Sequence, residues 1–550
     1  MTRDLLTVTP AERVERLKTL YDAPACSVAA LLCDGHDPAS VAYKIVHADL
    51  SVDTMTYDQL RIDSERFASA LSSLGIGPGD RVATLMGKSR SYLIALMGIW
   101  RLGAVHVPLF TAFAPAAIAF RLNGSNAKII ICDAAQEAKL AAGDDIPHDA
   151  PWRVIRTGAS GAGLTFDTLL EAASPGFPAA AMGGDAPLIH IYTSGTTGKP
   201  KGVVVPVRAL AAFRAYAEFG LDLQSDDLYW CAADPGWAYG LYFGILASFA
   251  TGVPSLLLEG GFSPETTLSV MAKHGVTNFA AAPTVYRALR SAGVDVPPGI
   301  ALRRASSAGE PLTPDVNNWA GETLGVLVHD HYGQTEAGML INNHHHPLLQ
   351  RPIKPGSMGH AMPGWRAVIL SENSDEPIGA NQIGRVAIDV EDSPLAWFGG
   401  YAGDTANSDA KFGGGGRWYL TGDTGWTDDE GYFHFSSRDD DVIIMAGYRI
   451  GPFEVESVIA THAAVAECAV IAVPDAVRGE VMEAYIVLRA GETATQALRH
   501  DIQTWVKTRY AAHAYPREVH VVDALPKTPS GKVQRFVLKQ QRIAEIASER

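Results

Sequence analysis

The sequence predicts an α/β protein of at least two domains that ends in a compact α+β block. Three observations support this class. The chain has 550 residues, too many for a single hydrophobic core. Its first part alternates strand-like and helix-like apolar runs, as parallel sheets covered by helices do. Beyond a glycine-rich segment at residues 409–420, short strand-like runs predominate.

The apolar runs give the order of the elements in the first part. Strands are expected at residues 80–87, 104–109, 127–133, 186–191, 253–260 and 277–283. A helix at residues 88–103 joins the first two, and a helix that ends at Gly275 precedes the last. Arg101 and His106 interrupt the longest apolar stretch, so it predicts a buried helix and strand and no membrane span.

The C-terminal block shows its own pattern of elements. Strands are expected at residues 431–450, 464–475 and 482–491, with a helix at residues 452–462. The acidic run Asp439, Asp440 and Asp441 stands among apolar strands, which indicates an exposed hinge. We therefore expect a large N-terminal domain at residues 1–438 and a small C-terminal domain at residues 439–550, a size typical of an independent domain.

Composition limits the partners of the protein. The formal net charge of −15 argues against nucleic acid or an anionic membrane surface as the main partner. The five cysteines form no CxxC pair, and the N-terminus mixes charges throughout, without the apolar core of a signal peptide. These features predict a cytoplasmic protein with reduced thiols.

One loop has the composition of a phosphate-binding site. Residues 192–202 read YTSGTTGKPKG, after an expected strand. A Walker A loop needs four residues between its glycines and a Ser or Thr after GK, and this loop has neither. Consecutive backbone N–H groups in a glycine-rich turn still bind anions, and ligands bind at strand ends in open α/β sheets. A surface loop is the alternative reading of this stretch alone.

Later stretches turn this loop into part of a known set of motifs. They read SSAGEPL (residues 306–312), HYGQTEAG (331–338), YLTGD (419–423), SSRDDDVIIMAGYRIGPFEVE (436–456) and PKTPSGKVQR (526–535). Together with the loop, they resemble the adenylate-forming (AMP-binding) superfamily, most closely the medium-chain acyl-CoA synthetases and next the acetyl-CoA synthetases. This resemblance implies an α/β fold with a large N-terminal domain of several subdomains, with mixed and parallel sheets, and a small mobile α+β C-terminal domain.

The resemblance also implies a two-step reaction. A carboxylate attacks the α-phosphate of ATP to give acyl-AMP and pyrophosphate, and coenzyme A then takes the acyl group and releases AMP. ATP, Mg²⁺ and coenzyme A are the implied cofactors, and a small-molecule carboxylic acid is the implied substrate. Both steps bring anions together, so the protein must neutralise charge and align the reacting atoms.

The motifs imply roles for individual residues in nucleotide binding. Those of the loop, which would hold the β- and γ-phosphates, are Thr193, Ser194, Gly195, Thr196, Thr197, Gly198, Lys199 and Lys201. Those of the adenine site are Gly309, Glu310, Pro311 and Tyr332, and the neighbouring Gly333 and Gln334 also belong to the implied cofactor-binding residues. Thr335 matches the α-phosphate contact, and Glu336 matches the magnesium ligand. Asp423 matches the ribose ligand, and Arg438 and Arg449 match residues near the ribose or phosphate.

Two features connect the domains in this reading. Lys532 matches the catalytic lysine of the first half-reaction, where it would bridge the carboxylate and the phosphate. Asp440 matches the hinge about which the small domain swings, and Ala446 and Gly447 match the wall of the pantetheine tunnel. A lysine acyltransferase or deacylase acting on Lys532 is a further partner that the resemblance implies, and a homo-oligomer is compatible with the sequence.

The acid pocket is expected from the same resemblance. Gly333 stands where acetyl-CoA synthetases have a tryptophan, so we expect it to leave room for acids larger than acetate. Trp237, Ala238, Tyr239 and Gly240 match the opposite wall, and Tyr239 would refill part of the space. A short, branched or flat acid is therefore expected, with overlapping substrates, because one methylene changes binding by only about 1–3 kcal/mol.

Other readings remain open at this point. His344, His345 and His346 are adjacent in a loop near prolines, and we expect them to be solvated and not to hold a metal. The adenylate could load a carrier protein in trans, could react with oxygen as in luciferase, or could be absent from a nucleotide-binding regulator. The presence of Lys532, Glu336 and the whole loop argues against the last reading.

Overall fold

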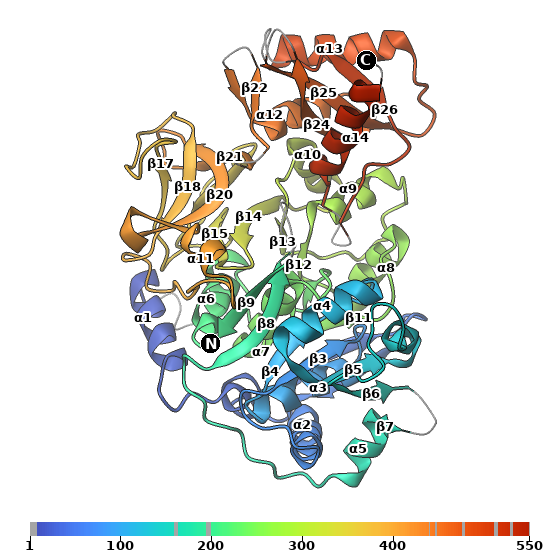
Figure 1. The fold of residues 1–550 in the computed structure, drawn as a ribbon, viewed down its shortest axis with the longest axis vertical. Helices are drawn as coiled ribbons and strands as arrows, with labels where there is room; N and C mark the ends of the chain where they lie inside the picture. Colours follow the sequence, from blue (N-terminus) through green and yellow to red (C-terminus); the bar gives the residue numbers. More distant parts are fainter. Residues whose placement is uncertain are drawn as a thin grey trace.

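The computed structural model describes residues 8–158, 163–193, 200–438, 441–445, 448–475, 479–510, 515–528 and 532–548. In these residues the strands form three sheets, of seven, fourteen and five strands. Figure 1 shows the first two sheets in the lower and middle parts of the molecule and the five-stranded sheet at the top. The architecture is mixed α/β, with a large N-terminal domain and a small C-terminal domain, as expected.

The seven-stranded sheet runs in the order β7-β6-β5-β3-β4-β8-β9, parallel except for the last pair. Its strands are β3 (Arg81–Leu85), β4 (Val105–Pro108), β5 (Ala127–Asp133), β6 (Arg153–Thr157), β7 (Leu164–Thr165), β8 (Pro187–Thr193) and β9 (Lys201–Pro206). Its helices are α3 (Arg90–Arg101), α4 (Pro115–Ser125) and α5 (Phe166–Ala172). β4 is buried along its whole length, as parallel strands covered on both faces are.

The fourteen-stranded sheet combines a parallel half with an antiparallel half. The half toward β1, parallel except for the antiparallel pair of β1 and β2, has β1 (Val41–Val46), β2 (Val52–Thr56), β10 (Tyr229–Cys231), β11 (Ser255–Leu258), β12 (Asn278–Ala281), β13 (Arg304–Ala308) and β14 (Val328–Gln334). The antiparallel half has β15 (Gly338–Asn342), β16 (Ser357–Ala361), β17 (Ala367–Leu370), β18 (Gly384–Asp389), β19 (Phe412–Gly413), β20 (Trp418–Thr427) and β21 (Phe433–Arg438). β14 joins the halves, since it pairs in parallel with β13 and antiparallel with β15.

Several of the other helices of the large domain begin and end at residues that favour helix ends. These other helices are α1 (Pro10–Tyr21), α2 (Tyr57–Ser73), α6 (Ala209–Ala215), α7 (Ala247–Thr251), α8 (Pro264–His274), α9 (Pro283–Ser291), α10 (Pro314–Thr323) and α11 (Thr405–Asp409). α8 begins after Ser263, whose hydroxyl accepts from the Thr266 N–H, and it ends at Gly275 with φ 70°. A left-handed C-terminal residue of this kind favours glycine.

The five-stranded sheet has its own core. Its strands are β22 (Ile443–Met445), β23 (Tyr448–Ile450), β24 (Val465–Asp475), β25 (Gly479–Leu488) and β26 (Glu518–Val521), and its helices are α12 (Pro452–Ile459), α13 (Gln496–Arg509) and α14 (Arg535–Ser548). Apolar side chains from β24, β25, α12 and α13 form a buried cluster apart from the larger core. No described helix is long and apolar enough to cross a membrane.

Candidate active site

A cavity of about 820 Å³ lies where the two domains meet. Its walls come from the ends of β8, β13, β14 and β20 in the large domain and from β24 and α14 in the small one. The predicted site residues among its lining are Thr193, Lys201, Gly309, Glu310, Pro311, Tyr332, Gly333, Gln334, Thr335, Glu336, Asp423, Arg438 and Lys532. Sequence segments hundreds of residues apart therefore meet here.

A hydrogen-bond network fixes one wall of the cavity. The Tyr332 hydroxyl donates to Asp423 Oδ2, and Gln334 Nε2 donates to the same oxygen at 2.8 Å. The Tyr419 hydroxyl donates to Gln334 Oε1 at 2.7 Å, which orients the amide. Burial raises the pKa of Asp423, while the Arg438 guanidinium on the neighbouring strand opposes this rise. Oδ1 of Asp423 makes no hydrogen bond with the described residues, so this carboxylate keeps an acceptor for a ligand.

Glu336 occupies a second fixed position, just after β14. Its Oε1 accepts from the Tyr401 hydroxyl at 2.8 Å, and its Oε2 makes no hydrogen bond with the described residues. The Tyr242 hydroxyl donates to the backbone oxygen of Thr335 at 3.1 Å, which holds the preceding residue. A carboxylate oxygen without a protein partner, in the cavity that Thr193 also lines, fits Mg²⁺, an ion that takes few protein oxygens and keeps several waters.

Gly309 and Glu310 form the part of the large-domain wall that Lys532 approaches. A Cβ on Gly309, which has φ 106°, would lie 3.9 Å from Lys532 Cε. Glu310 pairs with Arg287 at 2.7 Å through one oxygen, and its other oxygen is buried without a partner among the described residues. The small domain thus packs Lys532 against the predicted adenine segment.

The Lys532 side chain enters the cavity from a short turn. Its N–H donates to the Thr528 hydroxyl at 3.1 Å, and its carbonyl accepts from the Thr528 N–H at 2.8 Å. The Lys532 residue is exposed to the solvent in the cavity, although protein surrounds it on several sides. Desolvation by the surrounding protein lowers the pKa of Lys532, while the carboxylates of Glu310, Asp423 and Glu336 favour its charged form.

The phosphate loop is described only at its two ends. Thr193 closes β8 and Lys201 opens β9, and the two pair across the strands. The Lys201 ammonium lies 5.1 Å from the centre of the Tyr401 ring, next to Glu336. Ser194, Gly195, Thr196, Thr197, Gly198 and Lys199 lie outside the described residues, as do Asp440, Ala446 and Gly447. For Arg449, only the backbone in β23 is described.

The predicted acid-pocket wall consists of packed aromatic rings. Trp237 contacts Phe110 and Phe113, with ring centres 5.3 and 5.7 Å apart. Tyr239 packs against Phe243 at 5.5 Å, and its hydroxyl lies 3.3 Å from that of Tyr216. Ala238 packs beside the same core. Gly240 is required by close packing, since a Cβ there would lie 2.3 Å from the Asp234 carbonyl oxygen.

The role expected for Gly333 is wrong in one respect. A Cβ at this position would lie 2.1 Å from the Gly338 carbonyl oxygen and 2.7 Å from Met339 Cα. The pairing of β14 with β15 shifts register between Tyr332 and Gly333, which brings the two backbones together. Glycine is therefore required by the strand contact, and its presence does not indicate a pocket opened for larger acids.

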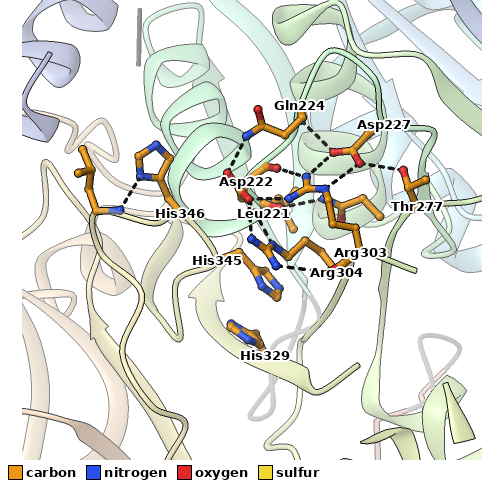
Figure 2. A network of polar contacts seen from close by, with 12 residues as sticks. Leu221, Asp222, Gln224, Asp227, Thr277, Arg303, Arg304, His329, His345 and His346 are labelled. Atoms are coloured by element: carbon orange, nitrogen blue, oxygen red, sulfur yellow. Dashed lines mark hydrogen bonds and ion pairs between the residues drawn. The ribbon is translucent and has the colours of Figure 1, made fainter. Parts of the chain in front are cut away.

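The prediction that His344, His345 and His346 are solvated is also wrong. All three are buried, because residues 343–346 continue from β15 alongside β14 and then contact residues 219 and 220: the Asn343 N–H donates to the Asp330 carbonyl, and the His345 and His346 N–H groups donate to the Gly220 and Phe219 carbonyls. Figure 2 shows His345 beside His329, with ring centres 3.5 Å apart and planes inclined by 20°. His329, His331 and His345 have ring nitrogens within 4.8 Å of one another. Stacked rings cannot direct two lone pairs at one ion, and His329 Nδ1 and His331 Nε2 already contact the Asn343 carbonyl, so this cluster is hydrogen-bonded core.

The same region is tied together by ion pairs. Arg303 contacts Asp222 and Asp227 at 2.7 and 2.5 Å, and Arg304 contacts Asp222 at 3.0 Å (Figure 2). Burial keeps the histidines neutral: it lowers the pKa of His329 and of His344 to about 4. The strand β14, which carries Tyr332 and Gln334, thus lies in a closely packed region whose histidine side chains are neutral.

Three residues at or next to the cavity were missed at the sequence level. Tyr401 holds Glu336, Tyr419 orients Gln334, and Lys411 lines the cavity together with Tyr401 and Asp423. Tyr419 stands inside the quoted YLTGD motif, so the motif could have indicated it. Tyr401 and Lys411 lie in the glycine-rich connection before β20, where no pattern distinguishes them from surface residues.

Comparison with known protein families places the chain. A sequence profile described as AMP-binding enzyme matches residues 36–392, and one described as AMP-binding enzyme C-terminal domain matches residues 454–532. The chain is 37% identical over 495 residues to an acetyl-coenzyme A synthetase of Bacillus subtilis, covering 88% of this chain and 84% of that protein. It is 33% identical to a mitochondrial acyl-coenzyme A synthetase, ACSM4, of Rattus norvegicus, with 92% and 87% covered.

Solved structures agree with these matches. A crystal structure of an acyl-CoA synthetase of Brucella canis has a TM-score of 0.76 and 40% identity, and the match covers 100% of this chain and 99% of that one. A benzoate CoA ligase of Burkholderia xenovorans has a TM-score of 0.83 and 28% identity, with 93% and 99% covered.

Proposed function

The chain belongs to the AMP-binding enzyme family, among its adenylate-forming acyl-CoA ligases, and we propose that it activates a short- or medium-chain, branched or aromatic carboxylic acid. In the first half-reaction the acid and ATP give acyl-AMP and pyrophosphate. In the second, coenzyme A accepts the acyl group and AMP is released. The observation that carries the proposal is the convergence of Lys532, Glu336 and Asp423 on one interdomain cavity.

The residues of the large domain would bind and orient the nucleotide. Tyr332 and the backbone at residues 309–311 take the adenine, and the remaining acceptor of Asp423 takes the ribose hydroxyls. Thr193, Lys201 and the loop between them take the β- and γ-phosphates, with Thr335 at the α-phosphate. Glu336 would hold Mg²⁺, which when bound neutralises charge on the phosphates.

Lys532 would serve the first half-reaction. Its side chain lies beside the adenine segment; desolvation lowers the pKa of Lys532, and the carboxylates of Glu310, Asp423 and Glu336 oppose this shift. There it stabilises the negative charge that builds up as the carboxylate oxygen bonds to the α-phosphorus and the bond to pyrophosphate breaks. We place the domain boundary after residue 438 and a hinge at Asp440; rotation there would withdraw Lys532 and bring Ala446, Gly447 and Arg449 to the thiol of coenzyme A.

The most specific element of the proposal is the chemical class of the acid substrate. Trp237 packs with Phe110 and Phe113, and Tyr239 packs with Phe243. An acid pocket bounded by these aromatic rings would favour flat or branched acyl groups. A relative with solved structure is a benzoate CoA ligase, and a sequence relative is an acetyl-coenzyme A synthetase. Because Gly333 does not mark an opened pocket, acetate belongs in the test as a competing outcome.

The test is pyrophosphate release from ATP and Mg²⁺ with a panel of acids, from acetate through straight and branched C4–C8 acids to benzoates. Each acid is assayed with and without coenzyme A. Turnover that requires one acid class and coenzyme A is the expected result. If coenzyme A does not stimulate pyrophosphate release, the acyl acceptor would be a carrier protein in trans. If no acid gives pyrophosphate release, the proposal is overturned.

A further inference from the structure

Lys411 is a cavity residue with no role in the nucleotide site proposed above. It stands between α11 and β20 and lines the interdomain cavity. Its ammonium donates to the carbonyl oxygens of Leu420 and Thr421 at 3.2 and 2.9 Å, and it lies 5.5 Å from the centre of the Tyr419 ring. Two backbone contacts therefore fix its position before any ligand binds.

The charge of Lys411 has no direct counter-ion. In the part of the chain that the structure describes, no carboxylate oxygen pairs with this ammonium, and the side chain is half-buried. Burial lowers its pKa, while Glu336 and Asp423 oppose this from a longer distance and Arg438 and Lys201 add to it. A lysine has three N–H donors, and the backbone takes two. A cation held in this way gains from an anionic ligand.

The neighbours of Lys411 indicate which anion it meets. The Thr421 carbonyl that accepts from Lys411 also accepts from Gln334 Nε2, which donates to Asp423, and Glu336 lines the same cavity. In the proposed function, Asp423 holds the ribose and Glu336 the metal on the phosphates. The group of a nucleotide that joins these two parts is the α-phosphate. We infer that Lys411 binds the α-phosphate of ATP, acyl-AMP and AMP, an inference that rests on the proposed function.

This assignment separates Lys411 from Lys532. Lys411 is fixed to β20, the strand that carries Asp423, so it stays with the nucleotide whatever the small domain does. Lys532 comes from the small domain and would serve only the first half-reaction. Lys411 transfers no proton; it neutralises charge on the non-bridging oxygens of phosphorus while the bond to the carboxylate forms and the bond to pyrophosphate breaks.

The test compares AMP with adenosine, which differ by the phosphate alone. Binding of each to the full chain is measured by calorimetry for wild type, Lys411→Met and Lys411→Arg. For the Met variant we expect about 10- to 100-fold weaker binding of AMP, the loss typical of a charge-assisted contact, and adenosine binding within about twofold of wild type. The Arg variant should recover most of the AMP affinity, because it keeps the charge.

A matched control removes a similar lysine outside the cavity. Lys354 pairs with Asp428 at 2.6 Å and lies 4.4 Å from the centre of the Tyr432 ring, so Lys354→Met also deletes a cation beside a tyrosine. This control should leave the ratio of AMP to adenosine affinity unchanged. Adenosine binding itself reports whether each variant retains a folded site.

The outcomes separate the inference from the proposed function. If wild type exchanges pyrophosphate with an acid and Lys411→Met binds AMP as wild type does, the role of Lys411 is overturned and the proposed function stands. Equal losses for AMP and adenosine would show a structural role and would also overturn it. Wild-type protein that neither exchanges pyrophosphate nor binds AMP would overturn both.

Discussion

The two walls of the cavity are built in different ways. In the large domain, Tyr332, Gln334 and Tyr419 hold Asp423 and one another through hydrogen bonds, and Tyr401 holds Glu336. In the small domain, Lys532 follows Thr528, and the backbone on both sides is held by the contacts of Thr528 and by the Gln534 N–H, which donates to the Pro526 carbonyl. Arg535, three residues on, connects α14 to Glu456 in α12 at 2.8 and 2.6 Å.

This difference indicates that the two domains have different roles at the site. A wall whose side chains fix one another keeps its geometry without ligand, as binding of a nucleotide requires. A single cation on a short turn of another domain can be brought in or withdrawn without disturbing that wall. A substitution in one wall should therefore leave the other wall of the cavity intact.

Removal of Lys532 should give the largest effect, and on one half-reaction only. We expect Lys532→Ala to reduce acid-dependent ATP–pyrophosphate exchange by about 10²–10³-fold, because a contact to developing charge is lost. Thioester formation from supplied acyl-AMP and coenzyme A should stay within about threefold of wild type. Lys527→Ala is the control. Lys527 lies five residues before Lys532, and its ammonium pairs with Glu467 at 2.6 Å. Equal loss in both assays would contradict the division between the walls.

Low pH should reduce the folding stability contributed by the buried histidines next to the large-domain wall of the cavity. The folded pKa values of His329 and His344 are lowered to about 4 by burial, so their contribution to stability is complete above about pH 6.5. It is lost as the pH falls through this window, by about 3 kcal/mol for each histidine at pH 4. Urea unfolding between pH 7 and pH 4 measures this slope.

A histidine variant checks the source of that slope. His344→Asn keeps a hydrogen-bond donor but cannot take up the proton, so its stability should fall less steeply between pH 6.5 and pH 4 than that of wild type. The comparison uses the slope, so a lower stability of the variant at pH 7 does not affect it. A slope equal to that of wild type would exclude this histidine as a source.

Loss of the Arg535 pair should act on the small domain alone. Arg535→Met leaves Glu456 buried without its partner, which costs about 3 kcal/mol for such a pair. We expect faster hydrogen exchange in α14 and β24 and unchanged exchange in β14. Lys539→Met, one turn further along the same helix, removes only an exposed pair with Glu480 at 3.4 Å and should change exchange little. Faster exchange in both domains would show that the walls are not independent.

The smallest effect is expected from one hydroxyl of the large-domain wall. Tyr401→Phe removes the donor to Glu336, a hydrogen bond to a charged group worth about 1.5 kcal/mol, or about tenfold in an equilibrium constant. The Mg²⁺ concentration that half-saturates pyrophosphate exchange should rise by this factor. Tyr432→Phe, whose hydroxyl donates to the Pro352 carbonyl outside the cavity, should leave it unchanged. An unchanged Mg²⁺ response in both variants would remove Glu336 from the metal site.

The sequence by itself determined the elements and the motifs. Ser263 and Gly275 bound α8 because they satisfy helix ends locally, and the expected strands at residues 80–87 and 127–133 form because their apolar runs fit buried parallel strands. The motif residues around Glu336, Asp423 and Lys532 could also be chosen in advance, since their spacing resembles that of a known family.

Only the tertiary structure decided what surrounds those residues. His344, His345 and His346 are buried because residues 343–346 pair with β14 and with residues 219 and 220, contacts that no local pattern encodes. Gly333 is fixed by the backbone of β15, and Lys411 enters the cavity because Leu420 and Thr421 hold its ammonium. Burial, close approach and charge pairing depend on segments distant in sequence, so they appear only when the chain is folded.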